Sequence, residues 1–293
     1  MRESAVTTSV PPNDWLYYRI HVDAADAGDR LLKQVVRPVL RELTAELPTS
    51  AGPRWFFLRF SDVTGLHVRL RLNAERQALQ QAQRALDTAL AAAGAQKSPI
   101  CESFGKYLYA PEIWKFGDGY GMRLAEELFQ ASSEMVLEFF SDQPSISRVD
   151  YGTAHLLQMV AGLPERQRAS FLHQYAWYWS GGPTRRPGHP APGGPRRPDR
   201  SDDEVAQLLS QARRALDAPV AGAALRRYRA RFWDAMHGSE RNLIPRSDYF
   251  LLFHHIHLTN NRIGVFPAVE SAIARMLWLA MRNGMMTNFM PVA

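Results

Sequence analysis

Three short segments in the first hundred residues carry arginine, histidine and aromatic side chains at every second position. The side chains concerned are His67, Arg69 and Arg71 in LHVRLRL, Tyr17, Arg19 and His21 in WLYYRIHV, and Trp55, Phe57 and Arg59 in WFFLRF. Because side chains alternate between the two faces of a β-strand, each segment would present its set on one face. Such a face is either an ordinary solvated surface or a cationic binding surface. Solvated faces usually mix charges of both signs, whereas these segments contain no acid, which supports the binding surface.

A short turn follows in the segment YAPEIWKFG. Pro111 and Gly117 bracket it, and it exposes Glu112 and Lys115. Taken alone, this pattern is typical of a structural turn with a surface ion pair.

A third group of titratable side chains lies in FHHIHLTNNRIG. On a helix, residues three and four apart are neighbours, so His254, His257 and Asn261 fall along one side. A metal site is disfavoured because His255 and His257 diverge on a helix, no carboxylate sits at ligand spacing and Cys101 is the single cysteine. Histidines in such a helix most often belong to the core. The more specific alternative is that one of these histidines acts as a general acid or base, because imidazole titrates near neutral pH.

The first 110 residues alternate between strand-like and helix-like patterns. The predicted strands are Trp15–Val22, Trp55–Phe60, Leu66–Leu72 and Ile100–Tyr109, and the predicted helices are Asp26–Leu47 and Ala74–Ala93. The turn SDVTG predicts that the second and third strands pair as a hairpin. The order βαββαβ is that of a ferredoxin-like unit, in which helices cover one face of an antiparallel sheet. The sequence therefore predicts an α+β fold.

After Pro111 the patterns are helical. The predicted helices are Tyr120–Phe140, Ser147–Ala161, Glu165–Trp179, Asp202–Leu216, Val220–His237, Asp248–Asn260 and Ala268–Arg282. We expect a disordered start at 1–14 and a single domain at 15–293, with a sheet half at 15–110 and a helical half at 111–293. Five arginines, with many prolines and glycines, predict a mobile loop at 181–200. No aromatic residue interleaves these arginines, so we do not expect direct nucleic-acid binding.

The composition is that of an ordinary globular protein. The 293 residues are 46% hydrophobic and 22% charged, and the formal net charge of +6 would suit an acidic partner. No apolar run approaches the roughly 20 residues that span a bilayer, and the first residues lack an apolar signal core. One cysteine excludes an internal disulfide. These features predict a cytoplasmic protein without a membrane partner.

Five ordered motifs carry a resemblance to a known family. They are W-F-F-x-R-F, H-x-R-x-R, Y-x-P-E-x-x-K-F-G, E-x-L-F-x-x-S-S and H-L-x-x-N-R-I-G. Together, from Trp15 to past Gly264, they resemble the C-terminal elimination domain of class I lantibiotic dehydratases, and in particular its stand-alone, thiopeptide-type version. The large glutamylation domain of that family is missing from this sequence. The resemblance therefore implies that a separate, tRNA-dependent protein glutamylates the precursor peptide.

The resemblance implies a lyase that eliminates glutamate from glutamylated Ser or Thr of a leader-bearing precursor peptide, leaving dehydroalanine or dehydrobutyrine. Two of the family's machinery positions correspond to Arg71, the second arginine of H-x-R-x-R, and His257. Lys115 stands where the family has arginine, and Ser132 stands where it has an acid. Lysine keeps the charge but loses the bidentate fork that grips a carboxylate. The reaction requires no metal or redox cofactor.

Other residues of these motifs would bind substrate or hold the cations in place. They are Arg19, Arg59, His67, Arg69, Glu112, Asn261 and Arg262.

Two alternative functions stay open. One is a thiopeptide pyridine synthase, which descends from the same domain and joins two dehydroalanines in a formal [4+2] cycloaddition, with loss of water and the leader peptide. The other is a non-catalytic module that binds a leader peptide or tRNA through the cationic sheet and the arginine-rich loop.

Overall fold

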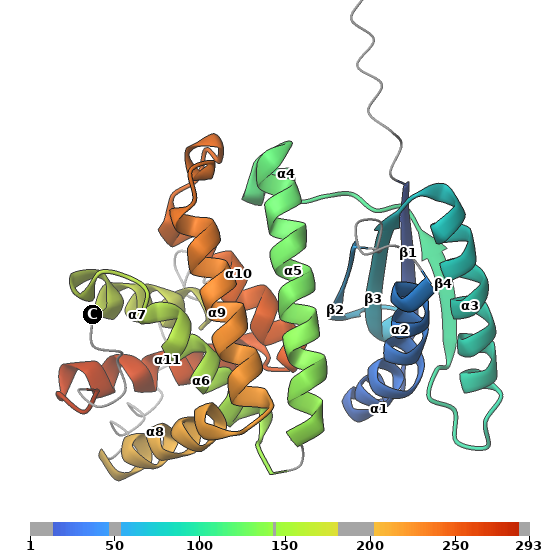
Figure 1. The fold of residues 1–293 in the computed structure, drawn as a ribbon. Coiled ribbons are helices and arrows are strands. Elements are labelled where there is room, and N and C mark those ends of the chain that lie inside the picture. Colours follow the sequence, from blue (N-terminus) through green and yellow to red (C-terminus); the bar gives the residue numbers. More distant parts are fainter. Residues whose placement is uncertain (1–13, 47–53, 143–144, 181–201, 287–293) are drawn as a thin grey trace, which may run out of the picture. The chain divides into compact units, whose positions relative to one another are not determined.

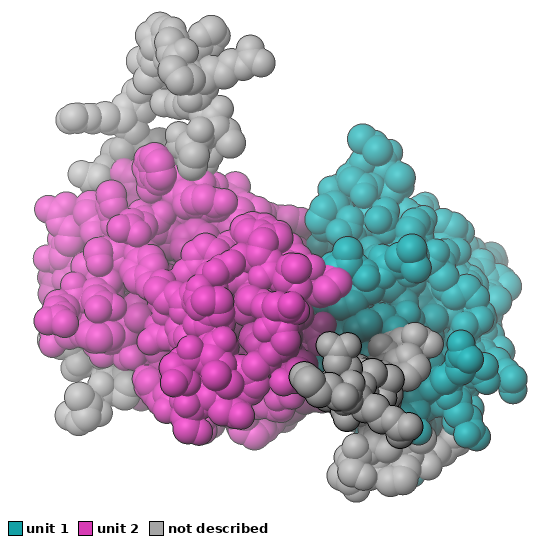
Figure 2. All heavy atoms as spheres, turned by 90° about the horizontal axis from the view of Figure 1, so that it is seen from above, with its two compact units in different colours: residues 1–110 teal, residues 111–293 magenta. Residues whose placement is uncertain are grey.

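A computed structural model describes residues 14–46, 54–142, 145–180 and 202–286 (Figure 1). The chain divides into two compact units, Met1–Ala110 and Pro111–Ala293, shown in teal and magenta in Figure 2. The division falls where the sequence pattern changes from mixed to helical. Of the predicted disordered start at 1–14 the structure describes only Asp14, the first residue of β1, and the predicted mobile loop at 181–200 lies outside the described residues.

The first unit is built on one antiparallel sheet. Its strands are β1 (Asp14–His21), β2 (Arg54–Asp62), β3 (Gly65–Ala74) and β4 (Ser103–Tyr107). Their order in the sheet is β2-β3-β1-β4, and each neighbouring pair is antiparallel. The predicted hairpin joins β2 to β3, and Gly65 at φ 103° adopts a backbone conformation that glycine tolerates best. The α+β prediction and the ferredoxin-like strand order are confirmed.

Helices cover one face of this sheet (Figure 1). They are α1 (Ala25–Leu31), a π-helical turn (Leu32–Val36) and α2 (Arg37–Glu46), which follow one another directly, and α3 (Arg76–Gly94). Fully buried apolar side chains fill the space between them and the sheet, among them Ile20, Leu70, Leu31 and Leu86. Burying one such side chain stabilises the fold by about 1.5–3 kcal/mol. The core of this unit therefore lies on the helix-covered side of the sheet.

The second unit is helical. Its helices are α4 (Ile113–Phe116), α5 (Tyr120–Phe139), α6 (Arg148–Val160), α7 (Glu165–Trp179), α8 (Asp202–Asp217), α9 (Ala221–His237), α10 (Asp248–Ile263) and α11 (Pro267–Arg282). All the predicted helices are present, with ends that differ by a few residues. The additions are α4, a single helical turn in the segment predicted to be a turn, and two short 3₁₀ helices at Phe140–Asp142 and Arg241–Leu243.

The chain bends sharply between α10 and α11. Gly264, at φ 93°, ends α10 in the left-handed conformation, and Pro267 begins α11 after a two-residue connection. The bend between the two helix axes is 119°. Within the described residues, no single helix is long and apolar enough to cross a membrane, although this bent pair passes such a test of length and composition when taken together.

Candidate active site

The face of the sheet that the helices leave uncovered carries arginines. In the β1–β3 register, Tyr17 lies opposite Arg71, Arg19 opposite Arg69 and His21 opposite His67, so these six side chains share one face. On β4 the matching positions are Tyr107, Gly105 and Ser103. We call this surface the cationic face. Its composition on β1 and β3 is the one predicted from the alternation of residue types.

The prediction for β2 is wrong. Phe56, Leu58 and Phe60 lie opposite Arg71, Arg69 and His67, so they belong to the cationic face. Trp55, Phe57 and Arg59 therefore lie on the helix-covered face. Alternation shows which residues of a strand share a face, but not which set faces the helices, and both sets of β2 are aromatic.

Arg59 consequently lies between the sheet and its helices, where it forms an ion pair. Its Nη2 donates to Asp29 Oδ1 of α1 at 2.6 Å, and the two side chains are 12% and 11% exposed. Removing either partner would leave a buried charge unpaired, which is strongly destabilising. The expectation that Arg59 contacts substrate on the cationic face does not fit this position.

Arg71 lies among aromatic rings of its own unit. Its guanidinium carbon is 4.6 Å from the ring centre of Tyr17, 5.1 Å from Tyr109 and 5.4 Å from Phe56. The residue is only 8% exposed. Ring faces attract a cation, and low water access strengthens every charge interaction that it makes. Arg71 is therefore held as a positioned charge.

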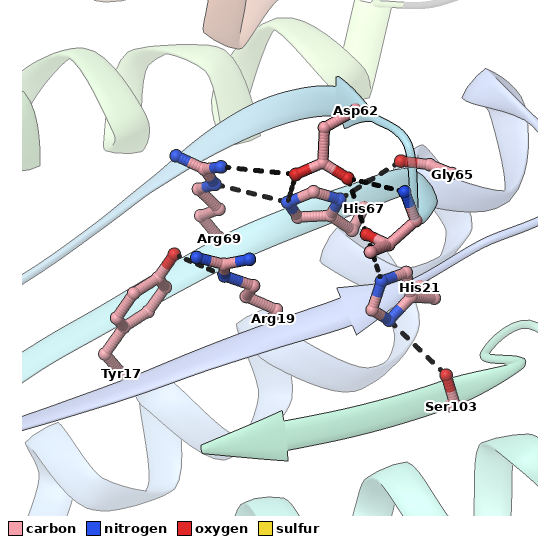
Figure 3. Close-up of polar contacts among 9 residues, drawn as sticks. Tyr17, Arg19, His21, Asp62, Gly65, His67, Arg69 and Ser103 are labelled. Atoms are coloured by element: carbon pink, nitrogen blue, oxygen red, sulfur yellow. Dashed lines mark hydrogen bonds and ion pairs between the residues drawn. The ribbon is translucent and has the colours of Figure 1, made fainter. Parts of the chain in front are cut away.

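Arg19 and Arg69 lie side by side in the next row of the cationic face (Figure 3). Arg19 Nε donates to Tyr17 Oη at 3.1 Å, and its guanidinium carbon lies 4.2 Å from the centre of the Tyr107 ring. Arg69 lies 3.3 Å from the centre of the Phe60 ring. Both guanidinium groups are thus stacked on aromatic rings.

His67 supports Arg69 and has no access to solvent. Its Nδ1 donates to Gly65 O at 3.1 Å, so its Nε2 is free of a proton and accepts from Arg69 Nε at 3.2 Å. Burial, and secondarily the charge of Arg69, lowers the pKa of His67, which keeps the ring neutral. The side chain is 0% exposed, which does not fit the expected contact with substrate. His67 instead orients Arg69.

In the helical unit, His257 of α10 is paired with a buried carboxylate. Its Nδ1 lies 3.1 Å from Glu270 Oε1 of α11, and the two side chains are 20% and 0% exposed. Tyr175 of α7 donates its hydroxyl proton to Glu270 Oε2. Burial, and next the charge of Glu270, raises the pKa of Tyr175 well above its ordinary value, so Tyr175 stays a donor.

These partners define the chemical state of His257. A carboxylate only accepts, so the proton of neutral His257 lies on Nδ1 and the lone pair lies on Nε2. The Trp179 ring stacks on the imidazole with centroids 3.9 Å apart and planes inclined by 20°. Glu270 and the ring face of Trp179 both stabilise a protonated imidazole. A histidine that a buried carboxylate orients in this way can act as a general base.

The two neighbouring histidines of α10 have a different environment. Burial, and then the charge of Lys115, lowers the pKa of His254 to about 4. His255 is surrounded by the rings of Phe116, Phe129 and Phe232, and burial lowers its pKa to about 3. Both are therefore neutral at neutral pH, and His255 has the core role that was the commoner expectation.

Lys115 and Glu112 lie beside α10. Lys115 Nζ is 2.6 Å from Glu112 Oε1 and 4.9 Å from the centre of the Trp114 ring. The Trp114 ring in turn contacts His254, one turn before His257 on α10. The structure thus brings together the predicted pair of Lys115 and Glu112, at the end of a short helix instead of on an irregular turn.

Two other predicted residues follow His257 on α10. Asn261 is half-buried one turn further along. Arg262 is 0% exposed, with its guanidinium 4.9 Å from the centre of the Phe129 ring, so the expected substrate contact does not fit it. Ser132 is equally buried and donates to Phe129 O at 3.0 Å, so it belongs to the packing of α5.

Three residues of this site are not predicted by the sequence patterns, namely Glu270, Tyr175 and Trp179. Tyr175 and Trp179 are one turn apart on α7, and Glu270 lies 13 residues after His257. A glycine followed by proline indicates where α10 ends and α11 begins, but it gives no angle between them. Within the described residues, no three His, Cys, Asp or Glu side chains converge as metal ligands would.

The chain belongs to the family described as lantibiotic biosynthesis dehydratase C-term, whose model matches residues 15–281. Three solved structures share the fold at low sequence identity. The tRNA-dependent lantibiotic dehydratase MibB from Microbispora sp. 107891 is 19% identical with a TM-score of 0.58, and the match covers 98% of this chain and 29% of MibB. This chain therefore spans less than a third of MibB.

The other two structures match over almost their whole length. The pyridine synthase TbtD from thiomuracin biosynthesis is 15% identical with a TM-score of 0.61, and the match covers 92% of this chain and 98% of TbtD. TsrL is 14% identical with a TM-score of 0.57, and the match covers 96% of this chain and 100% of TsrL. No curated protein sequence matches this chain significantly.

Proposed function

We propose that this chain eliminates glutamate from glutamylated Ser or Thr residues of a ribosomally made precursor peptide. A base removes the α-proton, the bond between the β-carbon and the ester oxygen breaks, and glutamate leaves as a carboxylate. The product is dehydroalanine or dehydrobutyrine. Membership of the family and the groups described above support this proposal.

The observation that carries the proposal is the pairing of His257 with Glu270. An α-proton next to a carbonyl group is weakly acidic, so its removal needs a base whose proton affinity suits neutral pH. His257 offers Nε2 as that base, because Nδ1 is committed to Glu270. After proton transfer the imidazolium lies between a buried carboxylate and an indole face. Both groups therefore stabilise the imidazolium as it forms.

Arg71 and Lys115 are proposed to stabilise negative charge. Proton removal places charge on the enolate oxygen, and departure of the ester places charge on the leaving carboxylate. Positioned cations in sites with little water provide the largest single contribution in reactions of this kind. Arg71 is stacked on aromatic rings in the sheet unit, and Lys115 is held by Glu112 in the helical unit.

The partners follow from the reaction. We propose that the substrate is a leader-bearing precursor peptide and that a separate, tRNA-dependent protein glutamylates it. The test is to incubate the pure chain with a glutamylated linear peptide and to follow the loss of glutamate by mass spectrometry. A parallel incubation with the His257→Ala variant should leave the glutamylated peptide unchanged. If the parent chain also leaves it unchanged, the proposal is wrong.

The second candidate is a pyridine synthase that joins two dehydroalanines. The observation in its favour is that two elimination positions differ from the family pattern, with Lys115 in place of arginine and Ser132 in place of an acid. Ser132 is buried within α5, so its hydroxyl cannot take the place of a solvent-accessible carboxylate. Incubation with a fully dehydrated peptide distinguishes the two reactions, because only a pyridine synthase would release the leader peptide and water from it.

A further inference from the structure

A single turn of helix carries Lys115. This turn, α4, has four residues, and a helix of that length is unstable in water by itself, so other parts of the chain must hold it. The hydrogen bonds within the turn use the carbonyl groups of Glu112 and Ile113. The carbonyl group of Trp114 comes next along the chain. Carbonyl groups in the last turn of a helix need partners from outside that helix.

Arg246 supplies the partner for this carbonyl group. Its Nε and Nη2 both donate to Trp114 O, at 3.1 and 2.7 Å. Arg246 directly precedes Ser247, the residue that caps the start of α10. The same segment also packs against the end of α4, because a Cβ at Gly117 would lie 3.3 Å from Pro245 Cδ. The segment that leads into α10 therefore holds α4 by a charged donor and by close packing.

Arg246 is itself held in place by Arg241. The Arg241 guanidinium donates from Nη2 to Arg246 O and from Nη1 to Ile244 O, the latter at 3.1 Å. Its Nε donates to Asp248 Oδ1, in the first turn of α10, at 2.6 Å. One guanidinium thus joins two carbonyl groups of this short connection to the helix that follows. The backbone at Arg246 is therefore fixed relative to α10.

This support matters because the residue on α4 is a lysine. A lysine ammonium lies at the end of a flexible stem and lacks the planar fork with which an arginine grips a carboxylate. Lys115 Nζ lies 2.6 Å from Glu112 Oε1, and its charge is the second cause, after burial, that lowers the pKa of His254 on α10. The position of this ammonium group beside α10 therefore depends on how firmly the backbone of α4 is held.

We propose that Arg246 is a positioning residue, which holds Lys115 in place relative to His257 on α10. The inference rests on the proposed function, in which both groups take part in the elimination. Ser247 and His257 are ten residues apart on α10, or about 15 Å along the helix axis. The backbone of Arg246 thus lies far from the base, and Arg246 acts through Lys115. A displacement of a reacting group by about 1 Å can slow a reaction about a hundredfold.

The first test measures Lys115 itself and needs no turnover. The chain has four lysines, and the other three, Lys33, Lys97 and Lys106, belong to the first unit. Brief acetylation by acetic anhydride, followed by mass spectrometry of the peptides, gives the rate of labelling at each lysine. Arg246→Gln should raise the rate at Lys115 about fivefold, because a loosened turn exposes a side chain that is 16% exposed in the folded protein. The rates at the other three should stay unchanged, and Arg246→Lys, which keeps one donor, should give an intermediate rate at Lys115.

The second test is single-turnover elimination at a saturating concentration of glutamylated peptide. Arg246→Gln should slow the parent about tenfold without changing its affinity for the peptide. It should slow the Lys115→Ala variant no further, because both changes act on the same charge.

Arg226→Gln is the matched control. Arg226 Nη1 donates to Leu216 O, in the last turn of α8, at 2.7 Å, so this change also removes an arginine that binds a carbonyl group at a helix end. It should alter neither the labelling of Lys115 nor the rate of elimination.

The inference is overturned if Arg246→Gln leaves the labelling of Lys115 unchanged, or if it slows the Lys115→Ala variant as much as it slows the parent. A parent chain that eliminates no glutamate, while Arg246→Gln still raises the labelling of Lys115, would refute the proposed function alone. In that case the hold of Arg246 on Lys115 stands.

Discussion

Glu270→Gln is the change that tests the histidine mechanism most directly. Glutamine has nearly the same size and keeps a hydrogen bond to His257 Nδ1, but it removes the negative charge. An imidazolium and a carboxylate 3.1 Å apart attract by about 5 kcal/mol at the effective dielectric constant of about 20 that describes protein sites. If half of this attraction is lost from the transition state, the elimination rate falls about a hundredfold.

The assay is single-turnover elimination from a glutamylated peptide, followed from about pH 5 to pH 9. Because the carboxylate no longer stabilises the imidazolium that forms in the transition state, Glu270→Gln should react more slowly than the parent throughout this range. In a His257→Ala background, Glu270→Gln should slow the reaction no further, since the two groups act as one unit. Tyr175→Phe, which removes one donor to Glu270, should slow the parent reaction by about fivefold.

The control is Glu138→Gln, which removes a carboxylate of α5 that pairs with Arg227 at the surface of the same unit. It should react at the parental rate. Thermal unfolding of each variant separates loss of activity from loss of fold. A folded Glu270→Gln protein that reacts at the parental rate would refute the reasoning.

Three further changes test other parts of the structure. Arg71→Ala should slow single-turnover elimination about a hundredfold, whereas Arg71→Lys should retain part of the rate. Equal rates in both variants and the parent would show that the charge of Arg71 does not contribute to elimination. Lys115→Arg should keep or raise the rate and Lys115→Ala should lower it as Arg71→Ala does, which the same assay measures. The buried His255 has its pKa lowered from 6.5 to about 3, so the unfolded chain binds a proton first as the pH falls. Between about pH 6.5 and pH 3 His255 alone should therefore lower the free energy of unfolding by up to about 1.4 kcal/mol per pH unit, and urea unfolding of His255→Phe should show a weaker dependence on pH.

Local patterns in the sequence predict the elements and the cationic face of β1 and β3 because they depend on periodicity alone. The same patterns fail for Arg59, whose face depends on the register that the two-residue turn at 63–64 imposes on β2. They also fail for Arg262, which is fully buried. An arginine in a polar motif does not indicate that its face of the helix is the buried one.

The partner of His257 could not be predicted for a different reason. Glu270 comes near it only because Gly264 turns the chain by 119° between two helices. Sequence patterns give the ends of helices but not the angle between them, and a pair of side chains on different helices depends on that angle. The role of Tyr175, 95 residues away, depends in addition on how α7 packs against α11.

The corner between α10 and α11 also has a consequence for how the chain assembles. The contact between His257 and Glu270 closes a loop of 13 residues, whereas the contact between Tyr175 and Glu270 closes one of 95. Loop closure costs more entropy as the loop lengthens, so the short-range pair can form as soon as the corner folds. The histidine and its carboxylate are thus encoded together in one stretch, residues 248–282, that could be transplanted as one piece. A helical hairpin grafted with this corner would carry an oriented histidine into an unrelated scaffold.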